Sequence, residues 1–231
     1  MPEKNRYWQL DFARGFAVIL MLIFHLFFDA SYVGKIELEG LFFYLFPRFI
    51  GAMFVFISGF TMSYAFKNEL HLLKRALKLA TIAFSITTMT YILIPEKYVV
   101  FGIIHFFALS SLLVFPFIRK ENLCIFFGMS FTLFGFYIQQ FRFPINHFFW
   151  LGIVPEDFNT LDYYPLLPWF GILLLGIYTG KKVRLRKSQY RGGFVSFLGR
   201  HSLKIYLLQH PIIILLLHLY YGDILSRFIK M

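Results

Sequence analysis

Apolar runs of about 20 residues recur along this 231-residue chain, and they constrain its fold more than any other feature. Each run is long enough to cross the hydrocarbon core of a bilayer, about 30 Å thick, as a helix. Hydrophobic residues make up 58% of the chain and charged residues only 15%, whereas about a quarter of the residues in a soluble domain are charged. The sequence therefore predicts an all-α polytopic membrane helix bundle, with a single domain over residues 1–231.

The apolar runs predict about seven transmembrane helices joined by mostly short connections. Residues 142–163 form a longer connection that is aromatic and interrupted by prolines, so we predict an interfacial or re-entrant loop there. The seven predicted spans are residues 10–32, 41–66, 76–94, 99–118, 123–141, 164–180 and 196–221.

Charge is distributed unevenly between the two predicted sides of the membrane. If the spans alternate in direction, most of the 23 lysines and arginines fall on the side of the N-terminus, including the basic cluster at residues 181–187. The positive-inside rule makes this side cytoplasmic, and the cluster is suited to contact anionic lipids. We therefore predict a multi-pass protein of the cell membrane with a cytoplasmic N-terminus. The net charge of +11 is then explained by the orientation of the chain in the membrane, and no nucleic acid partner is predicted.

The first predicted span contains ionisable residues, which are costly in lipid unless they serve a site. His25 and Asp29 are four residues apart, so they share one face of a helix. A carboxylate can hold a histidine in one tautomer and stabilise its charged form, as a general base requires. The alternative is a polar pair that joins two helices. We predict that His25 and Asp29 are catalytic, with Arg14 three turns earlier, roughly 16 Å along the same helix.

Three further polar residues are predicted to bind the acceptor, the substrate to which a chemical group is transferred. His105 lies in the fourth predicted span, and His210 precedes Pro211 near the middle of the seventh, where a proline bends a helix and frees a carbonyl. Asp162 lies where the 142–163 connection meets the sixth span, and it either caps that helix or orients a hydroxyl or amine. Each histidine could instead be a donor that packs helices together.

Basic residues at the cytoplasmic ends of the spans are suited to hold phosphates, because the guanidinium fork matches phosphate geometry. Arg14 is preceded by Asp11 one turn earlier and followed by Gly15, which permits close approach of another helix or of a ligand. Arg75 and Lys78 occupy a second such position. We predict that Asp11, Arg14, Arg75 and Lys78 bind a nucleotide-bearing donor, although such side chains also serve as membrane anchors.

Metal and redox chemistry are not predicted. The single cysteine, Cys124, lies in an apolar run, which excludes an internal disulfide and a thiolate metal cluster. A metal site could be built from His25, Asp29, His105 and His210, but they match none of the recognised ligand spacings.

Six stretches of the chain form a pattern found in a known family. They are Asp11-x-x-Arg14-Gly15, Arg14-x10-His25, Phe56-Ile-Ser-Gly59, Gly102-Ile-Ile-His105, Asp162-Tyr-Tyr-Pro-Leu-Leu-Pro-Trp-Phe-Gly171 and Phe197-Leu-Gly-Arg-His201-Ser-Leu-x-Ile-Tyr206-Leu-Leu-Gln-His-Pro211. Together they resemble the catalytic domain of heparan-alpha-glucosaminide N-acetyltransferases over nearly the whole chain. The arginine-to-histidine spacing is shared with the wider group of transmembrane acyltransferases that O-acetylate sugars.

The resemblance implies transfer of an acetyl group from cytoplasmic acetyl-CoA to a hydroxyl or amine of a sugar or glycolipid on the outer side. It also makes a homodimer plausible. Two other classes of protein would place polar residues in the same positions. A small-solute or proton-coupled transporter would need a path that opens alternately to both sides, and a lipid-binding scaffold would not depend on His25.

Overall fold

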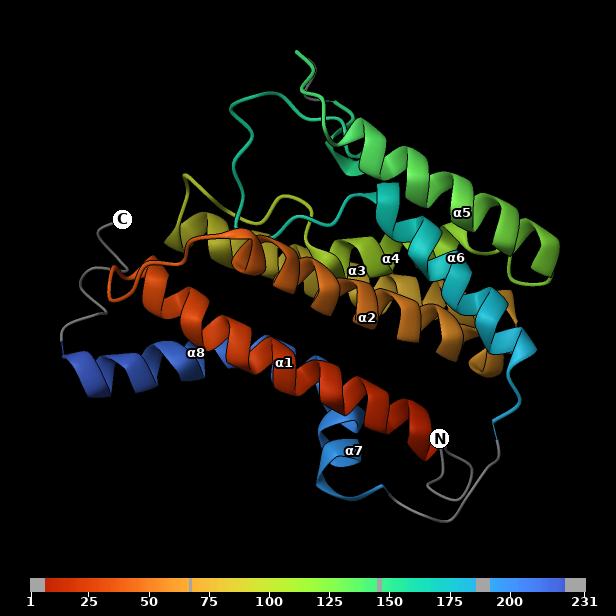
Figure 1. Ribbon diagram of the computed structural model, residues 1–231, viewed down its shortest axis with the longest axis horizontal. Coiled ribbons are helices and arrows are strands. Elements are labelled where there is room, and N and C mark those ends of the chain that lie inside the picture. The colour runs from red at the N-terminus through yellow and green to blue at the C-terminus, as the bar shows by residue number, and fades with distance from the viewer. Residues whose placement is uncertain (1–6, 67, 145–146, 186–191, 223–231) are drawn as a thin grey trace. The chain divides into compact units, whose positions relative to one another are not determined.

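The computed structural model describes residues 7–66, 68–144, 147–185 and 192–222, and these residues are helical and irregular with no β-strand (Figure 1). This confirms the predicted class, a polytopic bundle of membrane helices. In the described part of the chain, five helices are long and apolar enough to cross a membrane: α1 (Trp8–Tyr32), α2 (Leu41–Ala65), α3 (Glu69–Leu93), α5 (Glu121–Ile138) and α8 (Ser202–Tyr221).

The chain forms two compact units. One contains residues 1–57 and 184–231, and the other contains residues 58–183, so that α2 contributes residues to both. The prediction of one domain over the whole chain stays a prediction.

The first unit is organised around α1, which packs against α7 (Gly193–Arg200) and α8. The crossing of α1 and α7 is close because glycines meet there. A Cβ atom on Gly15 would lie 1.8 Å from the carbonyl oxygen of Val195, and one on Gly199 would lie 1.8 Å from that of Asp11. Only the absence of side chains at both positions lets the two backbones touch. The close approach predicted at Gly15 is therefore made by a helix.

Two apolar clusters join α1 and α8 and define how the helices are aligned. Near the end of α1, Ala30 and Val33 pack with Ile213 and Leu217 of α8. Nearer its start, Val18 and Met21 pack with Ile50, and Ile205 and Tyr206 of α8 contact this group. Higher numbers on α1 thus meet higher numbers on α8, and the two helices run in the same direction side by side (Figure 1).

The second unit contains an antiparallel pair, α5 and α6 (Leu166–Lys182). At one end the ammonium group of Lys182 lies 2.9 Å from the Glu121 carboxylate, and at the other the amide of Gln139 donates to the Leu167 carbonyl at 2.9 Å. Between these ends the helices touch closely, since a Cβ on Gly171 would lie 2.6 Å from the carbonyl oxygen of Gly128.

Helices α3 and α4 (Ile103–Leu113) form the other packed pair of this unit. The residues before α4 run beside the residues before α6: Leu161 donates to the Lys97 carbonyl at 3.0 Å and Tyr164 to the Phe101 carbonyl at 2.9 Å. This short parallel contact connects the loop after α5 to the start of α4. The predicted connection at 142–163 contains a short 3-10 helix, η2 (Phe149–Leu151), among its described residues.

Three predicted ranges are wrong in extent. The fourth span, 99–118, is α-helical only over the 11 residues of α4, roughly 16 Å, too short to cross a bilayer alone. The third span, 76–94, is predicted to start too late, because the side chain of Asn68 accepts from the backbone N–H of His71 and starts α3 at Glu69. The seventh span, 196–221, is divided at His201 into α7 and α8. Residues 186–187 of the basic cluster lie outside the described residues.

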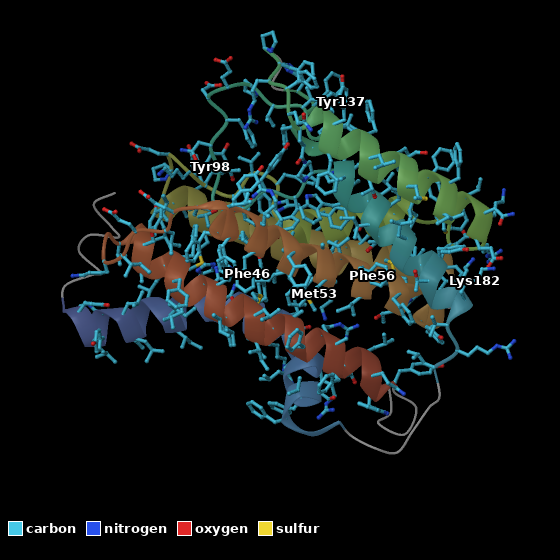
Figure 2. All side chains as sticks on the ribbon, viewed as in Figure 1. Phe46, Met53, Phe56, Tyr98, Tyr137 and Lys182 are labelled. Carbon is cyan, nitrogen blue, oxygen red and sulfur yellow. The ribbon has the colours of Figure 1, made fainter. Side chains whose placement is uncertain are left out.

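Many large apolar side chains point away from the helices, as expected for surfaces that face lipid. Ile92 is 73% exposed, Leu133 68% and Leu219 72%. Tyr137, 60% exposed, extends outward from the last turn of α5 (Figure 2), a position typical of an interfacial aromatic residue. Exposed positions on these helices are thus apolar, and an exposed aromatic residue lies near the end of α5.

Candidate functional site

Three ionisable side chains meet in the first unit. Nδ1 of His210, on α8, lies 3.0 Å from both carboxylate oxygens of Asp29, on α1. The rings of His25 and His210 are in edge contact, with centroids 4.5 Å apart. A carboxylate can only accept, so Nδ1 of His210 carries the proton. The side chain of Asp29 is 4% exposed, whereas that of His210 is 43% exposed.

The pairing of the carboxylate differs from the sequence prediction. Asp29 is predicted to orient His25 along one helix, but the carboxylate instead accepts a hydrogen bond from His210, which comes from a helix far away in the sequence. His210 was expected to contact the acceptor. The i and i+4 spacing does place His25 and Asp29 on one face, but the ring of His210 enters beside them and takes the hydrogen bond. Nδ1 of His25 is buried without a hydrogen-bond partner in the described residues.

The same three residues have the composition of a possible metal centre. One ligand atom from each of His25, Asp29 and His210 can be chosen so that all lie within 4.8 Å of one another. Two imidazoles and a carboxylate are a ligand set that zinc accepts, with a fourth position open. The group is equally suited to proton transfer, since the carboxylate lies close enough to stabilise a positive charge on either ring.

Sequence reasoning gave no role to Gln209, which precedes His210. The residue is 2% exposed, and both polar atoms of its side chain are buried without a partner in the described chain. One feature of the sequence could have indicated a role for Gln209: it is a second polar residue, next to His210, in an apolar span where a polar side chain needs a partner.

Arg14 and Asp11 form a pair near the start of α1. Nη1 of Arg14 lies 3.4 Å from Oδ1 of Asp11, and the side chains are 22% and 8% exposed. Asp11 lies where α7 crosses α1, since Gly199 packs on its carbonyl. Asp11 and Arg14, one turn apart in the sequence, therefore lie next to each other, and Asp11 holds the arginine near the start of α1.

In the second unit, Arg75 and Lys78 lie within the first turns of α3 instead of at a span end. Nη2 of Arg75 donates to the hydroxyl of Ser58 at 2.8 Å. Lys78 is exposed. Two successive turns of α3 thus present basic groups, one of them oriented by a hydroxyl from α2.

His105 is held by bonds to both ring nitrogens. The backbone N–H of Gly102 donates to Nδ1 at 3.2 Å, and Nε2 lies 3.0 Å from the hydroxyl of Thr87. That hydroxyl donates to the carbonyl of Val99 at 2.8 Å. Because Nδ1 accepts, Nε2 carries the proton and donates to Thr87, which completes a consistent chain of donors. The chain ties the start of α4 to α3, so His105 has a structural role.

Replacing Thr87 with valine is expected to lower the free energy of unfolding by about 1–3 kcal/mol, because Nε2 of His105 and the Val99 carbonyl both lose their partner. Thermal unfolding in detergent measures the change. Thr81→Val is the matched control, since Thr81 is exposed and its hydroxyl donates to the Leu77 carbonyl, one turn earlier on the same helix. Equal melting temperatures for the two variants would contradict the structural role of His105.

Asp162 caps a helix, but a different one from the helix predicted. Its Oδ2 accepts from the backbone N–H of Ile103 at 2.9 Å, at the start of α4. Beside it, the hydroxyl of Tyr163 donates to the Phe149 carbonyl at 2.6 Å. Burial raises the pKa of Tyr163, which Arg142 only partly opposes. Asp162 and its neighbours thus order the loop before α6, and a role in substrate binding stays a prediction.

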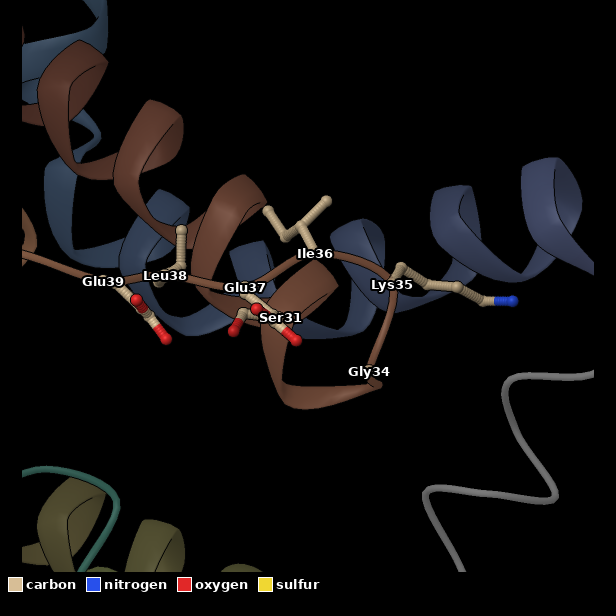
Figure 3. A pocket seen from close by; sticks show the side chains of 7 residues that line it. All are labelled: Ser31, Gly34, Lys35, Ile36, Glu37, Leu38 and Glu39. Carbon is tan, nitrogen blue, oxygen red and sulfur yellow. The ribbon is translucent and has the colours of Figure 1, made fainter.

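A pocket of about 640 Å³ lies beside the end of α1 in the first unit. It is lined by Ser31 and residues 34–39, and the side chains of Ser31, Glu37 and Glu39 point to one side, while Lys35 points away (Figure 3). This opening begins half a turn beyond Asp29 and was not predicted as a site. Carboxylates and a hydroxyl are groups that accept hydrogen bonds from hydroxyls and amines.

Comparison with known proteins identifies the family. No curated protein and no solved structure matches the chain. The family model described as heparan-alpha-glucosaminide N-acetyltransferase, catalytic, matches residues 6–211. The match includes His25, Asp29 and His210 and ends at Pro211, immediately after the cluster. The chain therefore belongs to the heparan-alpha-glucosaminide N-acetyltransferase catalytic family, which makes it a membrane acetyltransferase.

Proposed function

We propose that the chain transfers an acetyl group from cytoplasmic acetyl-CoA to a hydroxyl or amine of a sugar or glycolipid on the outer side of the cell membrane. The observation that carries the proposal is the cluster of His25, Asp29 and His210, which places two imidazoles and a buried carboxylate together where the apolar helices α1 and α8 pack side by side. The family match supports acetyl transfer as the reaction.

Each unit would offer the phosphates of the donor basic residues from the first turns of a helix, α1 in one unit and α3 in the other. Arg14, held by Asp11, and Arg75, held by Ser58, each present a guanidinium whose position is set by a neighbour. Such forks bind phosphate through two parallel hydrogen bonds. Lys78 adds an exposed positive charge one turn after Arg75 on α3. This arrangement is consistent with an N-terminus on the cytoplasmic side, where CoA is present.

The chemical step would use His25 as the base. His25 removes the proton from the acceptor hydroxyl or amine, which attacks the carbonyl carbon of the thioester. The carbonyl π electrons move to oxygen, then return as the carbon–sulfur bond breaks, and the leaving CoA thiolate takes the proton from the His25 imidazolium. A general base of this kind contributes about 10²–10⁴ to the rate. The carboxylate of Asp29, within 4.8 Å of a nitrogen of His25, stabilises the imidazolium that forms.

The acceptor would approach from the other end of α1. The pocket at residues 31–39 lies just beyond Asp29 and presents Glu37, Glu39 and Ser31 on one side. Sugar hydroxyls and amines donate to such groups. His105 and Asp162 were predicted as further acceptor contacts; their bonds to Thr87 and Ile103 favour ordering of α4 as their main role.

The proposal is tested by titrating acetyl-CoA into purified protein in detergent and measuring release of free CoA in the same samples. Arg14→Ala is expected to weaken donor binding by about tenfold or more, because it removes a charge-assisted phosphate contact. Lys204→Ala is the matched control: it removes one positive charge from an exposed position of α8 in the same unit.

Three outcomes test the enzyme assignment and the role of His25. Binding that Arg14→Ala weakens and Lys204→Ala leaves unchanged supports the enzyme. Absence of binding at micromolar protein and near-millimolar acetyl-CoA would contradict it and favour a transporter, which is tested next by solute uptake into proteoliposomes. Loss of turnover after treatment with a chelator, restored by zinc, would show that the cluster acts through a metal and would overturn the role of His25 as a free base.

A further inference from the structure

Gln209 of α8 carries a polar side chain to which the described fold gives no hydrogen-bond partner. It is 2% exposed, and its Nε2 and Oε1 are both buried without a partner in the described residues. Burying an amide in this way costs stability. Folded proteins leave few such groups unpaired, and each calls for an explanation such as a ligand.

The position of Gln209 on α8 places it beside the catalytic cluster. Gln209, Ile213 and Leu217 form the buried stripe of α8, spaced by one helical turn each. Ile213 and Leu217 pack on Ala30 and Val33 of α1.

One turn before Gln209, Ile205 packs with the cluster around Met21 of α1. Because α1 and α8 run in the same direction, Gln209 lies between these two levels, close to the turn of α1 that carries His25. The stripe is apolar above and below this point and polar only here.

A second buried group at the same level is also unpaired. Nδ1 of His25 has no partner among the described residues, whereas Asp29 and His210 satisfy each other. The seam between α1 and α8 therefore holds an unpaired base nitrogen and an unpaired amide within one helical turn. A thioester carbonyl attacked by an acceptor requires this combination: a group that takes a proton and a donor for the oxygen on which negative charge develops.

We propose that Gln209 is a catalytic residue whose Nε2–H donates a hydrogen bond to the carbonyl oxygen of the acyl group. This inference rests on the proposed acetyltransferase function. As the acceptor attacks, the carbonyl π electrons move to this oxygen and His25 takes the acceptor proton. When the electrons return, the carbon–sulfur bond breaks and the leaving thiolate takes the proton from His25. The amide holds the oxygen throughout and neither gains nor loses a proton.

The proposal predicts opposite changes in stability and in activity. Gln209→Met keeps the length of the side chain and removes its polar atoms, so the melting temperature in detergent is expected to stay equal or rise. Loss of one donor to an oxyanion lowers kcat by about 10²–10³. Affinity for CoA itself is expected to be unchanged. Gln209→Leu serves as a second variant of the same kind.

Gln139→Met is the matched control. The amide of Gln139 has a partner, the Leu167 carbonyl at 2.9 Å, in the other unit. Its replacement is expected to lower the melting temperature and leave kcat within about twofold of the wild-type value.

A ligand comparison gives a readout besides turnover. Ethyl-CoA lacks the carbonyl oxygen of acetyl-CoA and keeps the phosphates. Wild-type protein is expected to bind acetyl-CoA about fivefold more tightly than ethyl-CoA, in line with one hydrogen bond, and Gln209→Met is expected to lose this preference.

Two results would overturn the proposal in distinguishable ways. Wild-type kcat in a folded Gln209→Met variant, or an unchanged preference for acetyl-CoA, removes Gln209 from the mechanism and leaves the enzyme assignment intact. Wild-type protein that neither binds acetyl-CoA nor transfers the acetyl group removes the proposed function and the role of Gln209 with it.

Discussion

Replacing His25 with alanine is expected to lower the rate of acetyl transfer by about 10²–10⁴ while binding of acetyl-CoA stays intact. The rate falls because the acceptor loses the group that takes its proton. Binding is retained because the proposed phosphate contacts at Arg14 lie three turns away along α1, roughly 16 Å. Free CoA released with time measures the rate, and calorimetric titration measures the affinity.

The controls for this variant come from the other histidines. His71→Ala removes an exposed side chain of α3 and keeps the backbone N–H that donates to Asn68, so it is expected to act like wild type. His210→Ala leaves the carboxylate of Asp29 buried without its partner, so it is expected to lower both activity and stability. Full activity of His25→Ala would show that another group, with His210 first in line, is the base.

The second large effect is expected from Gly199→Ala. In a helix, alanine is normally more stable than glycine by about 1 kcal/mol. Here the new Cβ would lie 1.8 Å from the carbonyl oxygen of Asp11, so α7 must move away from α1. We expect a net loss of about 1–3 kcal/mol or more in the free energy of unfolding. Displacement of the backbone at Asp11 should also weaken donor binding through Arg14.

The melting temperature in detergent measures this loss, and Phe194→Ala is the control. Phe194 lies on the same helix and is 72% exposed, so its replacement is expected to change the melting temperature little. An increase in stability for Gly199→Ala would mean that the helices do not cross at this glycine. The sign of the change decides the matter, because intrinsic helix propensity and the observed packing predict opposite signs.

Much of the site could be predicted because the relevant spacing is local. The i and i+4 positions of His25 and Asp29 place them on one face of α1, and the i and i+3 positions of Asp11 and Arg14 allow the observed ion pair. The predicted roles of these residues in catalysis and donor binding stay predictions, as do those of Arg75, Lys78, His105 and Asp162.

The partner of Asp29 could not be predicted from spacing. His210 lies 181 positions away, and the packing of Ala30 and Val33 on Ile213 and Leu217 decides which face of α8 meets α1. The same packing buries Gln209 at the level of His25 along α1. Periodicity reports which residues share a face of one helix, but it carries no information about which face of another helix is opposite.

The sequence by itself determined the class of the protein, since apolar runs of membrane length must become helices to satisfy their backbone groups in lipid. It also determined the family, through motifs that extend along residues 6–211. Only the tertiary structure decided that α4 is short, that the last predicted span breaks at His201, and that Asp29 binds His210. Those outcomes depend on contacts between distant segments, where close approach at Gly15 and Gly199 and the bonds around Thr87 outweigh local preference.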